Sequence, residues 1–281
     1  ELYISPPAAI KQVNLLESSL NLQLFVRTHR GLLLTDAGKS FYHDAKYVIQ
    51  YCHESVNRAR NAMQKEEAVI RIGTSPMTPG QFLMDMWSSI HEICPDIKFQ
   101  LVPFENTPQN SVEILKNLGK NIDIVAGLFD DDFLKSRKCA GLLLSYEPIR
   151  CAVSIYNELS KKSKLSVTDL YDGNFMIIHR GWNKCLDIMR DDLLKNHSQI
   201  HIVDFDMFTL NAFNQCENSD NMMICIDNWA NVHPLLKVLP VDWDYCIPFG
   251  LLHSPKPSAN VKRFLEAVRQ VNPTPACKSK D

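Results

Sequence analysis

The stretch of residues 5–38, SPPAAIKQVNLLESSLNLQLFVRTHRGLLLTDAG, constrains the fold of this 281-residue chain more than any other. Ser5 is a favourable N-cap, and a proline at the first helical position loses no intrahelical hydrogen bond. Apolar residues then recur with helical spacing until Asn21, a suitable C-cap. The pattern predicts a capped helix over residues 5–20. Its outward face carries small or polar groups at Ala8, Lys11 and Gln12.

Two short strands about a basic turn are expected next, in LFVRTHRGLLLT. Thr35 then caps a helix that continues to about Lys65 without a proline. Apolar residues on this helix alternate spacings of three and four, at Tyr42, Ala45, Ile49, Cys52, Val56, Ala59 and Met63. Such a seam favours lengthwise packing against another long helix, and we expect the partner to be a second copy of the chain. The alternative is a helix that lies on the body of its own chain.

Charge is unevenly distributed along the sequence. Residues 1–65 hold eight Lys or Arg against five Asp or Glu, whereas the whole chain has a net charge of −2. A basic head on an acidic body indicates a polyanionic partner for the head. The sequence contains no apolar run of transmembrane length and no secretory signal, and its nine cysteines form no C-x-x-C pair. We therefore expect a cytoplasmic protein with reduced thiols and no membrane partner.

Strand and helix signals alternate from Ala68 onward. The expected strands are AVIRIG, IKFQLVP, IDIVAGL, RCAVSIY, FMIIH, IHIVDF, MMICI and YCIPFGLLHS. Helices are expected after a capping box at Thr78-Pro79-Gly80-Gln81, after Thr107, near residues 184–195 and 207–215, and in SANVKRFLEAVRQV. The acidic run at residues 130–132 predicts an exposed loop. Because IDIVAGL is nearly all apolar, it is typical of a sheet covered on both faces, and the predicted fold class is α/β.

The N-terminal stretch resembles the winged helix-turn-helix of LysR-type transcriptional regulators. The residues that carry this resemblance are Leu2, Ser5, Pro7, Ala8, Lys11, Gln12, Val13, Leu16, Glu17, Leu20, Leu24, Phe25, Arg27, Thr28, Leu34, Thr35, Ala37 and Gly38. Three positions depart from the family pattern. Pro6 stands where the family usually has Gln, Ile10 where it has a second Ser, and Asn21 where it has Gly. The first two lie on or near the DNA-facing helix, so the DNA sequence recognised is expected to be unusual.

The resemblance implies a domain organisation for the whole chain. Residues 1–38 would form a partial winged helix-turn-helix, residues 39–67 a linker and dimerisation helix, residues 68–271 an effector-binding domain and residues 272–281 a tail. The family's first helix would precede Glu1, and we expect a truncated chain rather than a natural protein without that helix. The effector-binding domain would have a type 2 periplasmic-binding-protein-like fold with two lobes. Lobe one would comprise 69–146 and 249–271 and lobe two 150–246, with crossings near 147–150 and 244–248.

These features predict a DNA-binding transcriptional regulator that responds to a small-molecule effector and recognises a double-stranded DNA operator. The residues expected to contact DNA are Ser5, Pro7, Ala8, Lys11, Gln12, Arg27 and Arg30. The resemblance also implies pairing of two dimers into a tetramer. The alternatives are a solute-binding receptor and an enzyme on the same two-lobed scaffold. No catalytic, phosphate-binding, dinucleotide-binding or metal-ligand motif is present, so neither catalytic residues nor a metal nor a cofactor is predicted.

The effector is expected where strands end and helices begin, outside the carboxyl ends of the strands. The residues expected there are Ser75, Met77, Thr78, Thr107, Gly127, Phe129, His179, Arg180, Trp182 and Asp206, several of them placed by the resemblance. A carboxylate is favoured, with Ser75 and Thr78 binding its acid group at a positive helix terminus. Phe129 and Trp182 would supply apolar walls. The alternatives are that Thr78, Thr107 and Asp206 are helix caps and that Arg180 is a surface charge.

Overall fold

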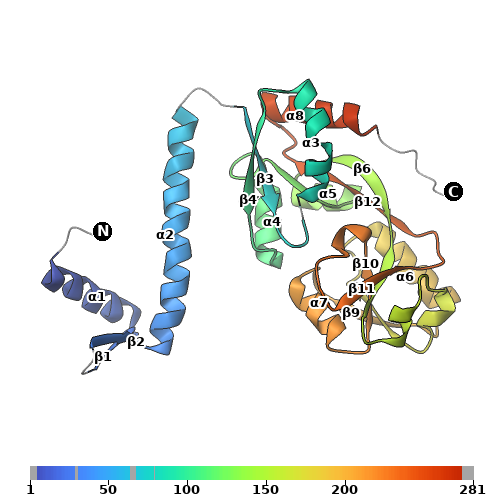
Figure 1. Ribbon diagram of the computed structural model, residues 1–281, viewed down its shortest axis with the longest axis horizontal. Helices are drawn as coiled ribbons and strands as arrows, with labels where there is room; N and C mark the ends of the chain where they lie inside the picture. Colours follow the sequence, from blue (N-terminus) through green and yellow to red (C-terminus); the bar gives the residue numbers. More distant parts are fainter. Residues whose placement is uncertain (1–4, 29–30, 64–67, 79, 274–281) are drawn as a thin grey trace. The chain divides into compact units, whose positions relative to one another are not determined.

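A computed structural model of the chain describes residues 5–28, 31–63, 68–78 and 80–273. The chain forms two compact units, Glu1–Glu66 and Glu67–Asp281. In Figure 1, the first unit contains a short helix, a hairpin and a long helix, and the second contains two mixed sheets with helices packed around them. Each unit is described separately below.

The first unit follows the predicted order of elements. Helix α1 spans Pro6–Leu20; the Ser5 hydroxyl accepts a hydrogen bond from the Ala8 N–H at 3.4 Å, and Asn21 ends the helix in the left-handed conformation with φ 51°. The hairpin consists of β1 (Phe25–Thr28) and β2 (Gly31–Leu34), paired antiparallel, and α2 spans Asp36–Met63. The predicted helix caps and hairpin are confirmed, because their signals are local in the sequence.

Hydrogen bonds to one short segment hold the two helices and the hairpin together. The Glu17 carboxylate accepts from the N–H groups of Leu24 at 2.6 Å and Phe25 at 2.9 Å, which joins α1 to β1. The Leu24 carbonyl accepts from the Thr35 N–H at 2.9 Å. The Thr35 hydroxyl in turn accepts from the Gly38 N–H at 2.8 Å, which caps α2. Leu24 is therefore the junction of the unit, and it is also buried.

The first lobe of the second unit is built on a five-stranded sheet with the order β4-β3-β5-β12-β6. Its strands are β3 (Val69–Thr74), β4 (Lys98–Pro103), β5 (Ile124–Leu128), β6 (Ala140–Pro148) and β12 (Cys246–His253). Strands β3, β4 and β5 are parallel, and β12 runs antiparallel between β5 and β6. Four helices belong to this lobe, namely α3 (Gln81–Ile93), α4 (Pro108–Lys116), α5 (Asp131–Arg137) and α8 (Ala259–Val271).

The second lobe is also built on a five-stranded sheet, with the order β11-β7-β10-β8-β9. Its strands are β7 (Arg150–Ser154), β8 (Asn174–Ile178), β9 (His201–Phe205), β10 (Met222–Cys225) and β11 (Leu236–Pro240). Its helices are α6 (Lys184–Asn196) and α7 (Leu210–Glu217), with short 3₁₀ turns at Glu158–Lys161, Val167–Leu170 and Asp227–Trp229. Strands β7, β8 and β10 contain long runs of buried apolar residues, as expected for a sheet covered on both faces.

The chain crosses between the lobes twice, and the two crossings are hydrogen-bonded to each other. The first runs from β6 through Ile149 into β7, and the second returns after β11 into β12. The Ile149 N–H donates to the Tyr245 carbonyl at 2.9 Å, and the Trp243 indole N–H donates to the Ile149 carbonyl at 2.8 Å. Ile149 is fully buried. The lobes are thus joined by a paired, packed double connection.

Further hydrogen bonds join the lobes away from the crossings. The Asp130 carboxylate accepts from the Phe133 N–H at 2.7 Å as the N-cap of α5, and its second oxygen accepts from the Lys184 N–H at 2.5 Å, at the start of α6. The Asn106 amide donates to the Phe208 carbonyl at 3.0 Å. A third bond, from the Trp229 indole N–H to the Met77 carbonyl at 2.9 Å, is buried. Hydrogen bonds from polar groups therefore hold the two lobes together along their boundary.

Two local predictions are wrong. The expected capping box at Thr78 does not form: α3 begins at Gln81 with Gly80 as its N-cap, and Thr78 instead pairs with Ser75 in an isolated β-bridge. The acidic run at 130–132 is not a loop, because Asp130 caps a short helix that continues to Arg137. The sequence also did not predict β6 or β11.

Gly38 yields a test of the first unit. A Cβ at this position would lie 2.0 Å from the Leu24 carbonyl oxygen and 2.9 Å from its carbon. We expect Gly38→Ala to destabilise the unit by about 3 kcal/mol, because the helix must move away from the segment that holds it. Urea unfolding followed by the loss of helical circular dichroism measures this. Gly80→Ala is the matched control, since its Cβ would meet only atoms at 3.5 Å or more; equal losses for both variants would contradict the prediction.

Asp130 tests the boundary between the lobes. We expect Asp130→Ala to lower the free energy of unfolding of the second unit by about 2–3 kcal/mol, because it removes a helix cap and a bond to the other lobe. Ser258→Ala removes only a cap, at α8, where the Ser258 hydroxyl accepts from the Val261 N–H. We expect this control to cost about 1 kcal/mol. Chemical denaturation of both variants decides the matter, and the prediction fails if Asp130→Ala costs no more than Ser258→Ala.

Candidate functional site

The outward face of α1 presents the polar residues singled out in the sequence. Lys11 and Gln12 are exposed, as is Pro7, and Ala8 is half-buried one turn before Gln12. Ser5 caps the N-terminus of the helix. The first two helical residues, Pro6 and Pro7, have no N–H, and the N–H groups of Ala8 and Ala9 donate to Ser5. The first turn contains no acidic residue. This face combines one cation, one amide and the Ser5 hydroxyl.

Of the two predicted arginines, one lies in the described part of the hairpin. Arg27 lies on β1, where the structure describes the backbone, and Arg30 lies outside the described residues. No residue of α1 is buried, and among the described side chains of residues 1–66 only Leu24 and Gly38 are. The unit therefore has little core of its own.

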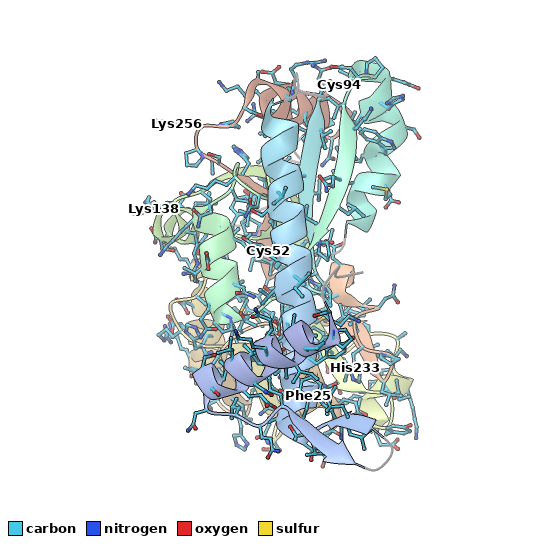
Figure 2. All side chains as sticks on the ribbon, turned by 90° about the vertical axis from the view of Figure 1, so that its left-hand side faces the viewer. Phe25, Cys52, Cys94, Lys138, His233 and Lys256 are labelled. Atoms are coloured by element: carbon cyan, nitrogen blue, oxygen red, sulfur yellow. The ribbon has the colours of Figure 1, made fainter. Side chains whose placement is uncertain are left out.

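The predicted seam on α2 is exposed at four residues, whereas Ala45 is half-buried and the side chains of Ala59 and Met63 lie outside the described residues. Tyr42 is 56% exposed, Ile49 59% and Val56 50%. Cys52, labelled on α2 in Figure 2, is also exposed. Exposed apolar side chains in a row along a long helix indicate a surface that a second element covers.

A cavity of about 210 Å³ lies between the two lobes of the second unit. Six of the residues predicted to bind an effector line it, namely Met77, Thr78, Gly127, His179, Trp182 and Asp206. Thr107 lines a second, adjoining hollow of about 610 Å³, which shares Met77 and Asp206 with the first. As the N-cap of α4, Thr107 already accepts a hydrogen bond from the Asn110 N–H at 3.2 Å.

The wall from lobe two is aromatic. The Phe208 ring centroid lies 5.4 Å from that of Trp182 and 4.5 Å from that of Trp229. Trp182 also meets Phe133 of lobe one edge-to-face, with the centroids 5.7 Å apart. Rings in such tilted and edge-on arrangements stabilise one another and leave little freedom to move. The cavity is therefore largely preformed on this side.

The wall from lobe one was predicted from the sequence only at Met77, Thr78 and Gly127. It is formed by residues of α4, β5 and β12, and the apolar ones include Val112, Ile114, Leu115, Val125 and Leu252. Arg137, the last residue of α5, also lines the cavity, with its guanidinium carbon 5.4 Å from the Phe133 ring centroid. No sequence signal marked Arg137, since its helix was itself not expected.

Three predicted residues lie apart from the cavity lining. The Ser75 hydroxyl is hydrogen-bonded to that of Thr78 at 2.8 Å, and Ser75 does not line the cavity. Phe129 is buried in the core of lobe one, where its ring packs closely against Gly141 and Gly250. Arg180 forms an ion pair with Asp191 and is 53% exposed. The hydrogen bond between this pair lowers the pKa of Asp191 and raises that of Arg180.

Two other features, a metal site and a membrane-spanning helix, are absent from the described ranges. There, no three His, Cys, Asp or Glu residues lie close enough to hold a metal ion. Among the described helices, none has both the length and the apolar composition to cross a membrane.

Comparison with known proteins supports the resemblance predicted for the N-terminal unit. Residues 1–39 match a protein family described as "Bacterial regulatory helix-turn-helix protein, lysR family". The nitrogen assimilation regulatory protein nac of Escherichia coli (strain K12) is 34% identical over 101 residues, which cover 36% of this chain and 33% of that protein. This chain thus spans about a third of the length of that curated relative.

Solved structures share the fold of the whole chain. The crystal structure of CbnR, a LysR family transcriptional regulator, has a TM-score of 0.56 at 18% identity and covers 96% of this chain and 91% of its own. CbnR in complex with its target DNA has a TM-score of 0.54. The effector binding domain of QuiR in complex with shikimate has a TM-score of 0.54 at 13% identity and covers 74% of this chain and 98% of its own.

These relatives are named as regulators, which agrees with the prediction that the chain is not an enzyme. Residues 1–39 therefore match the lysR-family helix-turn-helix, and the chain shares its two-lobed fold with the solved structure of a LysR family regulator.

Proposed function

We propose that this chain acts as a DNA-binding transcriptional regulator that dimerises through α2 and responds to a small carboxylate bound between the lobes of its second unit. The observation that carries the proposal is the exposed polar face of α1, within a unit that matches the lysR-family helix-turn-helix. An α-helix of this kind fits the major groove, where side chains reach base edges.

Different groups on α1 and the hairpin serve different parts of DNA recognition. Gln12 is exposed near the middle of α1. A glutamine amide can form hydrogen bonds with adenine in the major groove. Lys11 and the Ser5 hydroxyl supply phosphate contacts, which position the helix without reading sequence. Arg27, and Arg30 beyond it, serve the same purpose from the hairpin. The DNA complex solved for CbnR, which shares the fold, supports a DNA partner for this architecture.

Pairing through α2 explains the exposed apolar seam. A row formed by Tyr42, Ile49 and Val56 would be buried against the same row of a second chain. Two recognition helices would then bind two half-sites of one operator. Pairing of two such dimers into a tetramer is the further assembly that the family resemblance implies.

The cavity is the natural place for an effector. It lies at the boundary of two lobes that are joined by a paired crossing, so a ligand that contacts both lobes can change their relative stability. Shikimate bound by QuiR, which shares the fold, supports a small molecule at this architecture. A solute-binding receptor would use the same cavity, but it leaves α1, the hairpin and the seam on α2 without a purpose.

The DNA-binding role is tested by two substitutions that differ in kind. We expect Gln12→Ala to weaken binding to the best operator by about ten-fold while sparing random duplex, because it removes base contacts. Arg27→Ala should weaken binding to every duplex and reduce the salt dependence, because it removes a phosphate contact. Gel shifts at several salt concentrations, on operator fragments selected from random sequence, measure both. Equal losses on selected and random DNA for Gln12→Ala would exclude readout by Gln12.

Assembly is tested on the seam. We expect Ile49→Glu to shift the chain from dimer to monomer and to weaken operator binding together, because a carboxylate cannot be buried in an apolar helix pair without a partner. Asp44→Ala, at an exposed position outside the seam, is the control. Sedimentation velocity measures the oligomer, and an unchanged sedimentation coefficient for Ile49→Glu would refute pairing through this face.

A further inference from the structure

The cavity between the lobes contains a cation whose hydrogen bonding is incomplete. The Nε–H of Arg137 is buried and has no hydrogen-bond partner among the described residues. An unpaired buried donor on a charged group is costly, and native structures retain few of them. Arg137 also lines the cavity and is the only Lys or Arg among the described residues of its lining, so its guanidinium is the cation that the lining offers to a ligand.

The geometry around Arg137 favours a planar, anionic acceptor. The guanidinium carbon lies 5.4 Å from the Phe133 ring centroid, so the ring supports the cation on one side. Phe133 in turn meets Trp182 of the other lobe edge-to-face. A guanidinium held in this way presents its N–H groups as a rigid fork that matches the two oxygens of a carboxylate.

The other charged group of the cavity lining also favours an anionic acceptor beside Arg137. Asp206, from the end of lobe two's β9, is the other formally charged lining residue, and its side chain is exposed. His179 follows β8 in the same lobe and is exposed as well. The charged groups of opposite sign therefore come from opposite lobes, with the cation on lobe one. An acid group belongs on lobe one beside Arg137.

The size and apolar character of the cavity define the rest of the ligand. The lining near Arg137 contains Val112, Leu115, Val125 and Leu252, which offer no hydrogen bond from their side chains. Apolar cavities of about 150 Å³ bind benzene, whereas this one has about 210 Å³. The additional space accommodates a substituent of a few atoms. A six-membered ring with a short acid arm fills it.

We propose that the cavity binds a carboxylic acid with a ring-sized apolar body, its carboxylate hydrogen-bonded to Arg137 and its ring packed between the apolar wall of lobe one and the aromatic wall of lobe two. The proposal rests on the effector site proposed above and gives it a ligand class. It also assigns the acid group to Arg137 instead of Ser75 and Thr78, because Ser75 does not line the cavity and the Thr78 hydroxyl is hydrogen-bonded to that of Ser75.

The test is calorimetry on the full chain, without DNA, with four probes that separate charge from size. Phenylacetate has the acid and the ring, phenylacetamide is its neutral analogue, 2-phenylethylamine its cationic analogue, and acetate lacks the ring. We expect phenylacetate to bind at least about ten-fold more tightly than the other three, as for a charge-assisted hydrogen bond in a partly buried site. Because no DNA is present, the outcome is independent of whether the chain recognises an operator.

Variants of the chain assign the contacts. Arg137→Met replaces the cation with an apolar side chain that still fills much of the same space. We expect it to lower the affinity for phenylacetate by about ten-fold or more and to leave the affinity for phenylacetamide unchanged. Arg137→Lys should recover part of the loss, because it keeps the charge but not the fork. Val112→Trp should lower the affinity for phenylacetate and for phenylacetamide alike, because the larger side chain fills the cavity. Arg269→Met, on the exposed face of α8, is the matched control and should change neither.

Three outcomes would overturn the proposal. The first is that neither phenylacetate nor any other ring acid of similar size binds to a chain whose thermal unfolding is normal. The second is that the amine or the amide binds as tightly as the acid, which would give the polar role to Asp206 or to the hydroxyls. The third is that Arg137→Met and Arg269→Met bind phenylacetate equally well. If the unmodified chain binds phenylacetate but binds no operator DNA, the result counts against the proposed regulator function and leaves the ligand proposal standing.

Discussion

The second unit depends on one interaction, the pairing of its two interlobe crossings. Ile149 donates to and accepts from the returning segment, at Tyr245 and Trp243, and it is fully buried among them. A single crossing would allow the lobes to twist freely, whereas two crossings bonded to each other permit mainly a hinge motion about their common line. The cavity wall from each lobe is therefore presented to the other in a reproducible orientation, which a binding site requires.

Polar groups at the lobe boundary act through helix ends and main-chain atoms. Asp130 satisfies N–H groups at the start of α5 in its own lobe and at the start of α6 in the other. The positive terminus of α6 is thereby neutralised by the protein's own carboxylate. An anionic ligand gains little there, and Arg137 remains as the cation on the cavity side. The same geometry that closes the lobes thus selects where an acid can bind.

The sequence predicted elements well where their signals are local. Ser5 and Asn21 bound α1 as expected, since a cap is decided by a few neighbouring residues. Thr78 shows the limit: its sequence context fits a capping box, but the backbone turns back on Ser75 before the helix begins. The strand-end residues of the cavity were predictable, because topology gathers the carboxyl ends of parallel strands. Arg137 was not, because its position depends on a seven-residue helix that only tertiary packing and the Asp130 cap make stable.

The two units differ in how they obtain stability, and this difference links assembly to function. The described side chains of the first unit bury little apart from Leu24, while α1 and α2 both expose large apolar side chains. A unit of this size with so small a core gains its stability from whatever covers those surfaces. The proposed pairing along α2 and the proposed docking on DNA would both favour the folded form by mass action. The second unit needs no such help, because its core is continuous through both sheets. Ligand binding there can consequently act on the arrangement of the chains without being needed to fold them, which is the division of labour that a regulated DNA-binding protein requires.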